Sequence, residues 1–285
     1  MDRCWATCLG GCGKALTKEH LVSKSILPAP SVEVMGFPYC EATTKQIGTN
    51  SLVSHILCKT HNNALSELDT AAMTATATVK EAFRLAEVRA AGKARRWHVV
   101  RTTIPRPHLL ERWCLKTAIN MVVALPNLLQ NHPADTAYIP PAWMVRVAFG
   151  LERLRWPMGL YTMFGTRGRM PVETIVGLAP LADATGNLVG AQFAFHGLPL
   201  MLHLQHTPLD VVSVTAEPGT PSASNPFLGW IEPDYHVRRW QWQIGHRLSH
   251  LIDIKWPRSE RDGETPLTIG VTSNRVPPIP KKAEQ

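Results

Sequence analysis

The chain has 285 residues, 45% of them apolar, and carries a formal net charge of +8. This composition excludes a disordered chain, and the basic charge favours a polyanionic partner such as nucleic acid. The longest apolar run, around residues 118–125, is too short for a membrane span. The N-terminal residues do not follow the pattern of a secretory signal, so we expect a cytoplasmic protein without a membrane partner.

In chain order, the first segment with a clear pattern is 16–27, which mixes apolar and polar residues over the length of a strand. The segment 28–50 is rich in proline, glycine and threonine, which predicts a loop with short extended pieces. An alanine-rich helix is expected from near residue 58 to a stop at Gly92. A strand is expected over 96–105, and a helix with one apolar face between Pro107 and Pro126.

In the second half of the chain, the sequence pattern favours strands and loops after one further helix. A third helix is expected over 141–156, followed by two strands around the turn at 184–187 and a flexible loop at 218–226. The segment 236–256 is strand-like, and the polar tail beyond it predicts loose order. We therefore divide the chain into residues 1–92, an accessory region of mixed helices and strands over 93–256, and a tail over 257–285.

The cysteines are crowded at the N-terminus, with three of the six in the first twelve residues. In a reducing compartment this crowding favours a metal site over a disulfide framework. Cys8 and Cys12 are separated by three residues, two of them glycine, and Cys58 and His61 by two. Two such pairs on tight turns are typical of a tetrahedral zinc site. Cys4 is an alternative to Cys8, because three residues separate Cys4 from Cys8 as they separate Cys8 from Cys12. The simpler interpretation is that the cysteines are buried, unrelated to one another, and near a surface histidine.

A zinc ion joining these pairs would bring the adjacent Glu19 and His20 close to Asn62. A carboxylate and an amide oxygen are hard ligands, suited to a divalent ion such as Mg²⁺. A neutral imidazole at His20 is a suitable base near neutral pH. A metal, a base and a basic surface together indicate phosphodiester hydrolysis.

The segments CLGGCGKALTKEH (8–20) and CKTHNNALSELD (58–69) resemble the HNH (His-Asn-His) endonucleases. The resemblance covers about a quarter of the chain and implies an α+β fold, with an N-terminal zinc-stabilised ββα-metal module. It implies that His20 activates water, that Glu19 and Asn62 hold a catalytic divalent ion, and that Asn50 orients the base. Cys8, Cys12, Cys58 and His61 would hold the structural zinc.

Three features depart from the family pattern. In the family, two residues usually separate the first pair of cysteines, whereas three separate Cys8 from Cys12 here. The family also usually has a cysteine at the position of His61. The middle asparagine also sits at a longer spacing than usual, which leaves His55 as an alternative participant.

Four arginines are candidate nucleic-acid contacts: Arg95, Arg96, Arg238 and Arg239. Trp240 and Trp242 alternate beside the second pair, a pattern that suits stacking on bases but is more often core packing on a strand. The first pair is equally consistent with a solvated charge run. DNA is the expected substrate, with RNA as the alternative. The rival hypothesis is a non-catalytic, zinc-stabilised module that binds nucleic acid or protein.

Overall fold

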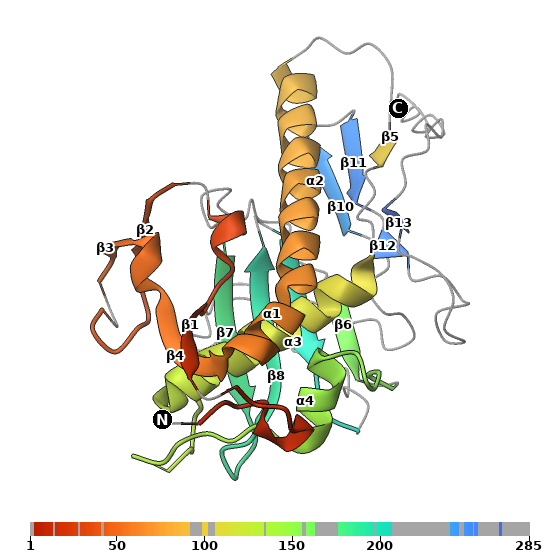
Figure 1. The fold of residues 1–285 in the computed structure, drawn as a ribbon. Coiled ribbons are helices and arrows are strands. Elements are labelled where there is room, and N and C mark those ends of the chain that lie inside the picture. Colours follow the sequence, from red (N-terminus) through yellow and green to blue (C-terminus); the bar gives the residue numbers. More distant parts are fainter. Residues whose placement is uncertain are drawn as a thin grey trace, which may run out of the picture.

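The structure is a computed structural model in which helices and small sheets are mixed (Figure 1). None of its described helices is long and apolar enough to cross a membrane. The described residues are 3–13, 15–27, 29–40, 43–91, 99–101, 106–133, 135–155, 158–162, 176–195, 198–206, 240–244, 248–252, 254–255 and 268–269.

The N-terminal unit is a pair of antiparallel strands followed by two consecutive helices. Its elements are β1 (Leu16–His20), β4 (Val53–Cys58), α1 (Lys59–Ala64) and α2 (Ser66–Ala91). The helix expected from near residue 58 is confirmed, with a break at Leu65 that separates α1 from α2. Acidic residues in the first turn of α2 favour a helix start there.

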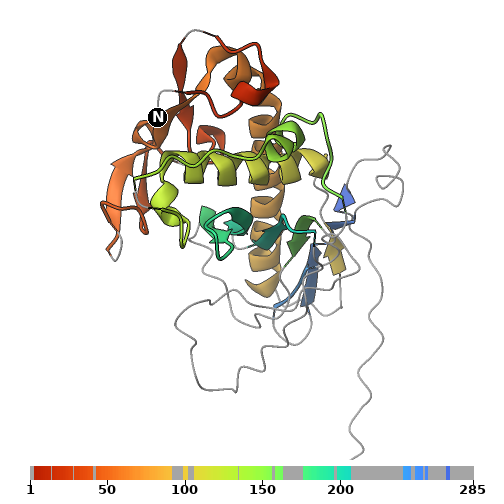
Figure 2. The same ribbon diagram turned by 90° about the horizontal axis from the view of Figure 1, so that it is seen from below.

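A hairpin interrupts this unit between its two strands. It consists of β2 (Ser31–Val34) and β3 (Lys45–Gly48), which pair antiparallel, and short 3-10 turns flank it as η2 (Lys24–Ile26) and η3 (Thr49–Ser51). The hairpin lies at the edge of the molecule, away from α3 and the larger sheet (Figures 1 and 2). Its two short strands confirm the short extended pieces expected in this segment.

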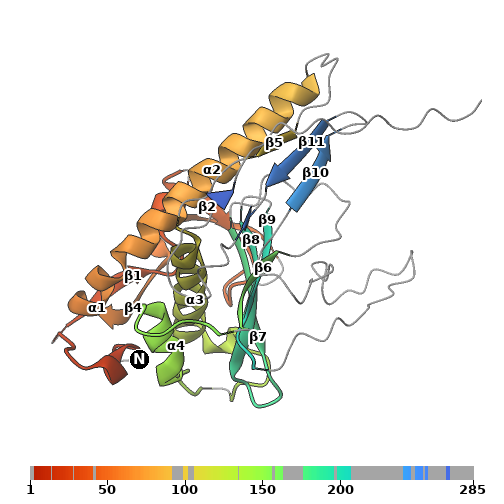
Figure 3. The same cartoon turned by 90° about the vertical axis from the view of Figure 1, so that its right-hand side faces the viewer.

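The central element is α3 (Pro107–Ala124), which begins with a proline at its first turn. One side of α3 packs on α2 and β4, and the other on the sheet of the accessory region (Figure 3). Trp113, Leu115 and Ile119 on this helix are fully buried. One hydrophobic core therefore joins the N-terminal unit to the following region.

The larger sheet has four antiparallel strands in the order β6-β9-β8-β7. They are β6 (Gly159–Thr162), β7 (Val176–Ala182), β8 (Leu188–Phe195) and β9 (Leu198–His203). The expected turn between two strands is confirmed between β7 and β8, where the Asp183 carboxylate accepts hydrogen bonds from the backbone of Thr185 and Asn187, each at 2.9 Å. The third helix, α4 (Ala142–Ala148), is shorter than expected, because Gly150 takes a left-handed conformation with φ of 74°.

The remaining strands form two small sheets. They are β5 (Val99–Arg101), β10 (Trp240–Ile244) and β11 (Leu248–Ile252) in one, and β12 (Ile254–Lys255) with β13 (Thr268–Ile269) in the other. The four predicted arginine contacts, Arg95, Arg96, Arg238 and Arg239, lie outside the described residues, as do the loop at 218–226 and most of the tail.

Candidate metal centre

Four side chains converge where the N-terminal segment meets the start of α1, and we call them the Cys/His cluster: Cys4, Cys12, Cys58 and His61. Their ligand atoms all lie within 4.8 Å of one another. The Nδ1 atom of His61 lies 3.4, 3.6 and 3.3 Å from the sulfurs of Cys4, Cys12 and Cys58. Neighbouring sulfur and nitrogen ligands of a tetrahedral zinc ion would lie about 3.6 Å apart. The donor set and its spacing therefore suit zinc.

Local structure explains how three distant segments reach this point. Cys58 ends β4 and caps α1, so His61 follows one helical turn later on the same side. The backbone N–H of Trp5 donates to Ile56 at 3.0 Å, which fixes Cys4 beside β4. Gly10 and Gly11 then take positive φ angles of 75° and 64°, and this turn returns Cys12 to the cluster.

Cys4, the alternative ligand, occupies the place predicted for Cys8. Cys4 is buried, whereas Cys8 is exposed and outside the cluster, on the 3-10 turn η1 (Thr7–Leu9). The sequence does not separate the two, because three residues lie between Cys4 and Cys8 and three between Cys8 and Cys12. The backbone bond of Trp5 to β4 decides between them, and it is a tertiary contact.

Burial and backbone contacts give the ligands different pKa values. Burial raises the pKa of Cys4 to about 12. Burial also raises that of Cys58, but hydrogen bonds from the backbone of His61 and Gly13 outweigh it, so the net pKa of Cys58 is lowered. Burial lowers the pKa of His61, which favours the neutral imidazole that binds zinc. Zinc would supply the positive charge that three converging thiolates require.

Glu19 lies apart from the Cys/His cluster, in contact with α3. Its carboxylate is buried, 2.8 Å from the Nζ of Lys116 and 3.1 Å from the amide nitrogen of Asn120, which donates to it. Burial raises the pKa of Glu19, while the charge of Lys116 opposes this rise. The side chain predicted to hold a catalytic ion therefore already has a cationic partner.

This ion pair belongs to a larger set of contacts, the carboxylate–lysine network, centred on Glu19, Lys116 and Asp69. Lys116 donates to both carboxylate oxygens of Asp69, at 2.8 and 3.0 Å. Ser23 donates to Asp69 and accepts from the indole of Trp113 at 2.7 Å. The network ties β1 and α2 to α3.

His20 is the last residue of β1 and directly follows Glu19. Its Nδ1 atom is buried and has no hydrogen-bond partner among the described residues. Burial lowers its pKa, the positive charges of Lys24 and Lys116 lower it further, and Asp69 opposes them. The imidazole is therefore neutral near pH 7 and has one unused nitrogen.

The two predicted asparagines make contacts of their own. Asn62 donates to the hydroxyl of Thr17 at 3.1 Å, and Asn50 accepts from Lys24 at 2.8 Å. Asn62 thus contacts β1 at Thr17, whereas Glu19 lies two residues further along, beyond an irregularity in the pairing of β1 with β4 between Thr17 and Lys18. The structure thus does not unite Glu19 and Asn62 around one ion, and the catalytic Mg²⁺ site does not fit these residues as they stand.

Sequence reasoning missed Asp69, Lys116 and Asn120, which surround Glu19. One signal was present: Lys116 and Asn120 are polar residues, one helical turn apart, in residues 113–124 of the helix, where Thr117 is the only other polar residue. Polar residues on a buried helical face need partners, so this pair pointed to a buried acceptor.

Comparison of the chain with protein-family models, with curated proteins and with solved structures finds no match in any of the three.

Proposed function

We propose that this chain hydrolyses phosphodiester bonds in nucleic acid, with His20 as the general base. The observation that carries the proposal is the partly buried His20 at the end of β1, whose Nδ1 atom has no hydrogen-bond partner among the described residues. The Cys/His cluster lies in the same unit of two strands and a helix. The same order of elements resembles the ββα-metal core of HNH endonucleases. The basic net charge of +8 is consistent with a polyanionic substrate.

In the proposed reaction, a neutral His20 takes a proton from water while the water oxygen bonds to phosphorus. The bond from phosphorus to the 3′-oxygen breaks, and that oxygen leaves and takes a proton from solvent. A divalent ion would stabilise the charge that develops on the phosphate and the leaving oxygen. Because Glu19 is engaged by Lys116, we assign no residue of this chain to hold that ion.

A second candidate function is supported by the same ion pair. Lys116 neutralises Glu19 without a metal, and side chains on three elements hold this arrangement in place. Such a buried pair suits a non-catalytic module, in which zinc and the carboxylate–lysine network hold a binding surface.

Cleavage assays separate the two. The full chain is incubated with labelled DNA or RNA in three conditions: with Mg²⁺, with Mn²⁺, and after a brief EDTA treatment that leaves its zinc content unchanged. We expect cleavage that His20→Ala lowers by about 100-fold or more, since a positioned base contributes at least that much. His206→Ala, which removes an exposed histidine after β9, is the matched control. Absence of cleavage by the zinc-loaded wild type in every buffer would support the binding module.

A further inference from the structure

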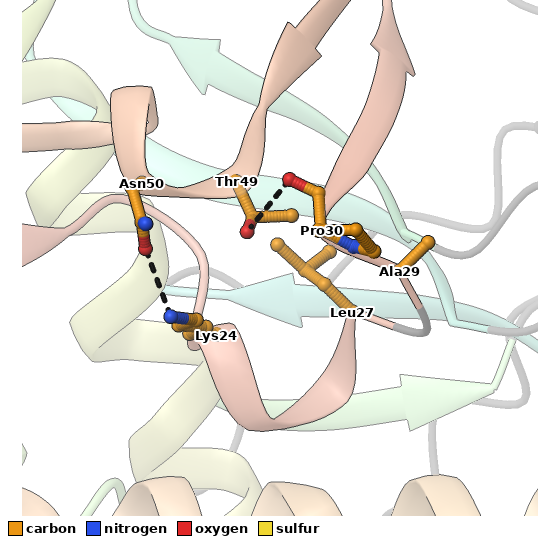
Figure 4. A pocket seen from close by; sticks show the side chains of 6 residues that line it. All are labelled: Lys24, Leu27, Ala29, Pro30, Thr49 and Asn50. Carbon is orange, nitrogen blue, oxygen red and sulfur yellow. Dashed lines mark hydrogen bonds between the residues drawn. The ribbon is translucent and has the colours of Figure 1, made fainter.

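A cavity of about 310 Å³ lies at the root of the β2–β3 hairpin (Figure 4). Its lining residues come from the two ends of the hairpin and from η2: Lys24, Leu27, Ala29, Pro30, Thr49 and Asn50. Thr49 donates through its hydroxyl to the carbonyl of Pro30 at 3.2 Å and through its backbone N–H at 2.8 Å, so this wall is closed by the chain itself. Of the lining side chains, Lys24 and Asn50 are the other polar ones.

Lys24 has a positive charge without a carboxylate partner among the described residues. Its Nζ donates to the neutral Oδ1 of Asn50 at 2.8 Å, and both side chains are exposed. Its charge also acts on His20, four residues earlier, so the two groups lie near each other at the end of β1. An unneutralised ammonium group beside an apolar cavity is a suitable contact for a phosphate oxygen.

The loop of the hairpin carries exposed aromatic surface. Tyr39 is 52% exposed and stacks on Phe37, with ring centroids 5.5 Å apart and planes 22° apart. The Nζ of Lys45 lies 5.4 Å from the centroid of the Tyr39 ring. An exposed ring with a neighbouring cation is the arrangement on which single-stranded nucleic acids stack their bases.

We propose that this hairpin binds single-stranded nucleic acid, with a backbone phosphate on Lys24 at the cavity and an unpaired base on Tyr39 in the loop. The inference rests on the proposed function for the class of substrate, and it adds the residues that hold the substrate. Each hairpin strand has four residues, about 13 Å in length, so phosphate and base belong to different nucleotides. A duplex would present its phosphates but not an unstacked base, so we expect it to bind more weakly.

The test measures binding without turnover. The full chain carrying His20→Ala is titrated into a labelled 20-nucleotide single strand and into the matching duplex, and fluorescence anisotropy is followed over a series of salt concentrations. We expect Lys24→Ala to weaken single-strand binding and to reduce the slope of log affinity against log salt by about 0.7, the value for one phosphate contact. We expect Tyr39→Ala to weaken it about 5- to 100-fold with an unchanged slope.

Two controls guard the interpretation. Lys80→Ala removes an exposed lysine on α2, and Glu33→Gln removes a negative charge from the hairpin, and neither should weaken binding. Unchanged zinc content and melting temperature in the test variants exclude unfolding. Affinities within twofold of the parent for both Lys24→Ala and Tyr39→Ala, or equal affinity for duplex and single strand, would overturn the inference. If both variants bind weakly but the wild type cleaves nothing, the inference holds and the proposed hydrolysis fails.

Discussion

The Cys/His cluster and the carboxylate–lysine network lie in the same small unit and differ in how their polar groups are partnered. The cluster gathers three cysteine sulfurs and an imidazole within 4.8 Å, close enough to hold a metal ion. In the network, the carboxylates of Glu19 and Asp69 share the single positive charge of Lys116. Glu19, the acidic residue of the expected nuclease motif, is therefore part of the packing against α3.

The largest expected effect comes from breaking the Cys/His cluster. Cys58→Ser should abolish zinc binding and lower the free energy of unfolding by more than about 5 kcal/mol, because structural zinc contributes strongly to folding. Elemental analysis and thermal unfolding measure both effects. Cys8→Ser is the matched control and should retain about one zinc per chain, as expected for a closed four-ligand site. Zinc loss in Cys8→Ser together with retention in Cys4→Ser would contradict the ligand set described above.

The next effect comes from breaking the network. Lys116→Met leaves Glu19 buried without a cation and should destabilise the protein by about 3–5 kcal/mol in urea unfolding. Adding Glu19→Gln to Lys116→Met should restore part of the loss, since the uncompensated charge is then absent. Zinc content should stay unchanged in both variants. A loss below about 1 kcal/mol for Lys116→Met would show that the ion pair is not a stabilising feature.

The smallest expected effect concerns His20, which lies beside the network. Its pKa is lowered, so the neutral form persists below the ordinary histidine range, and protonation occurs only as the pH falls further. Cleavage should therefore be constant around neutral pH and fall by about tenfold per pH unit below the pKa of His20. Lys24→Ala should move this fall to higher pH, because it removes a repulsive charge, and NMR titration of the imidazole should show the same direction. A fall at an unchanged pH would contradict the role of Lys24.

The sequence by itself determined the elements and part of the metal centre. Apolar periodicity and proline positions marked α2 and α3 closely, because local propensities govern such long helices. Cys12, Cys58 and His61 were identified because their spacing follows from turn and helix geometry. The pattern does not separate Cys8 from Cys4, because equal spacings carry no information about which residue faces the strand.

Only the tertiary structure decided what Glu19 and His20 contact. The partner of Glu19 is Lys116, 97 positions further along the chain, and no local pattern links two such positions. Packing of α3 against β1 buries the carboxylate, and burial requires a nearby charge or hydrogen bonds to compensate for lost solvation. The charges of Lys116 and Asp69 also act on the pKa of the adjacent His20, and both come from helices that follow β1 in the chain.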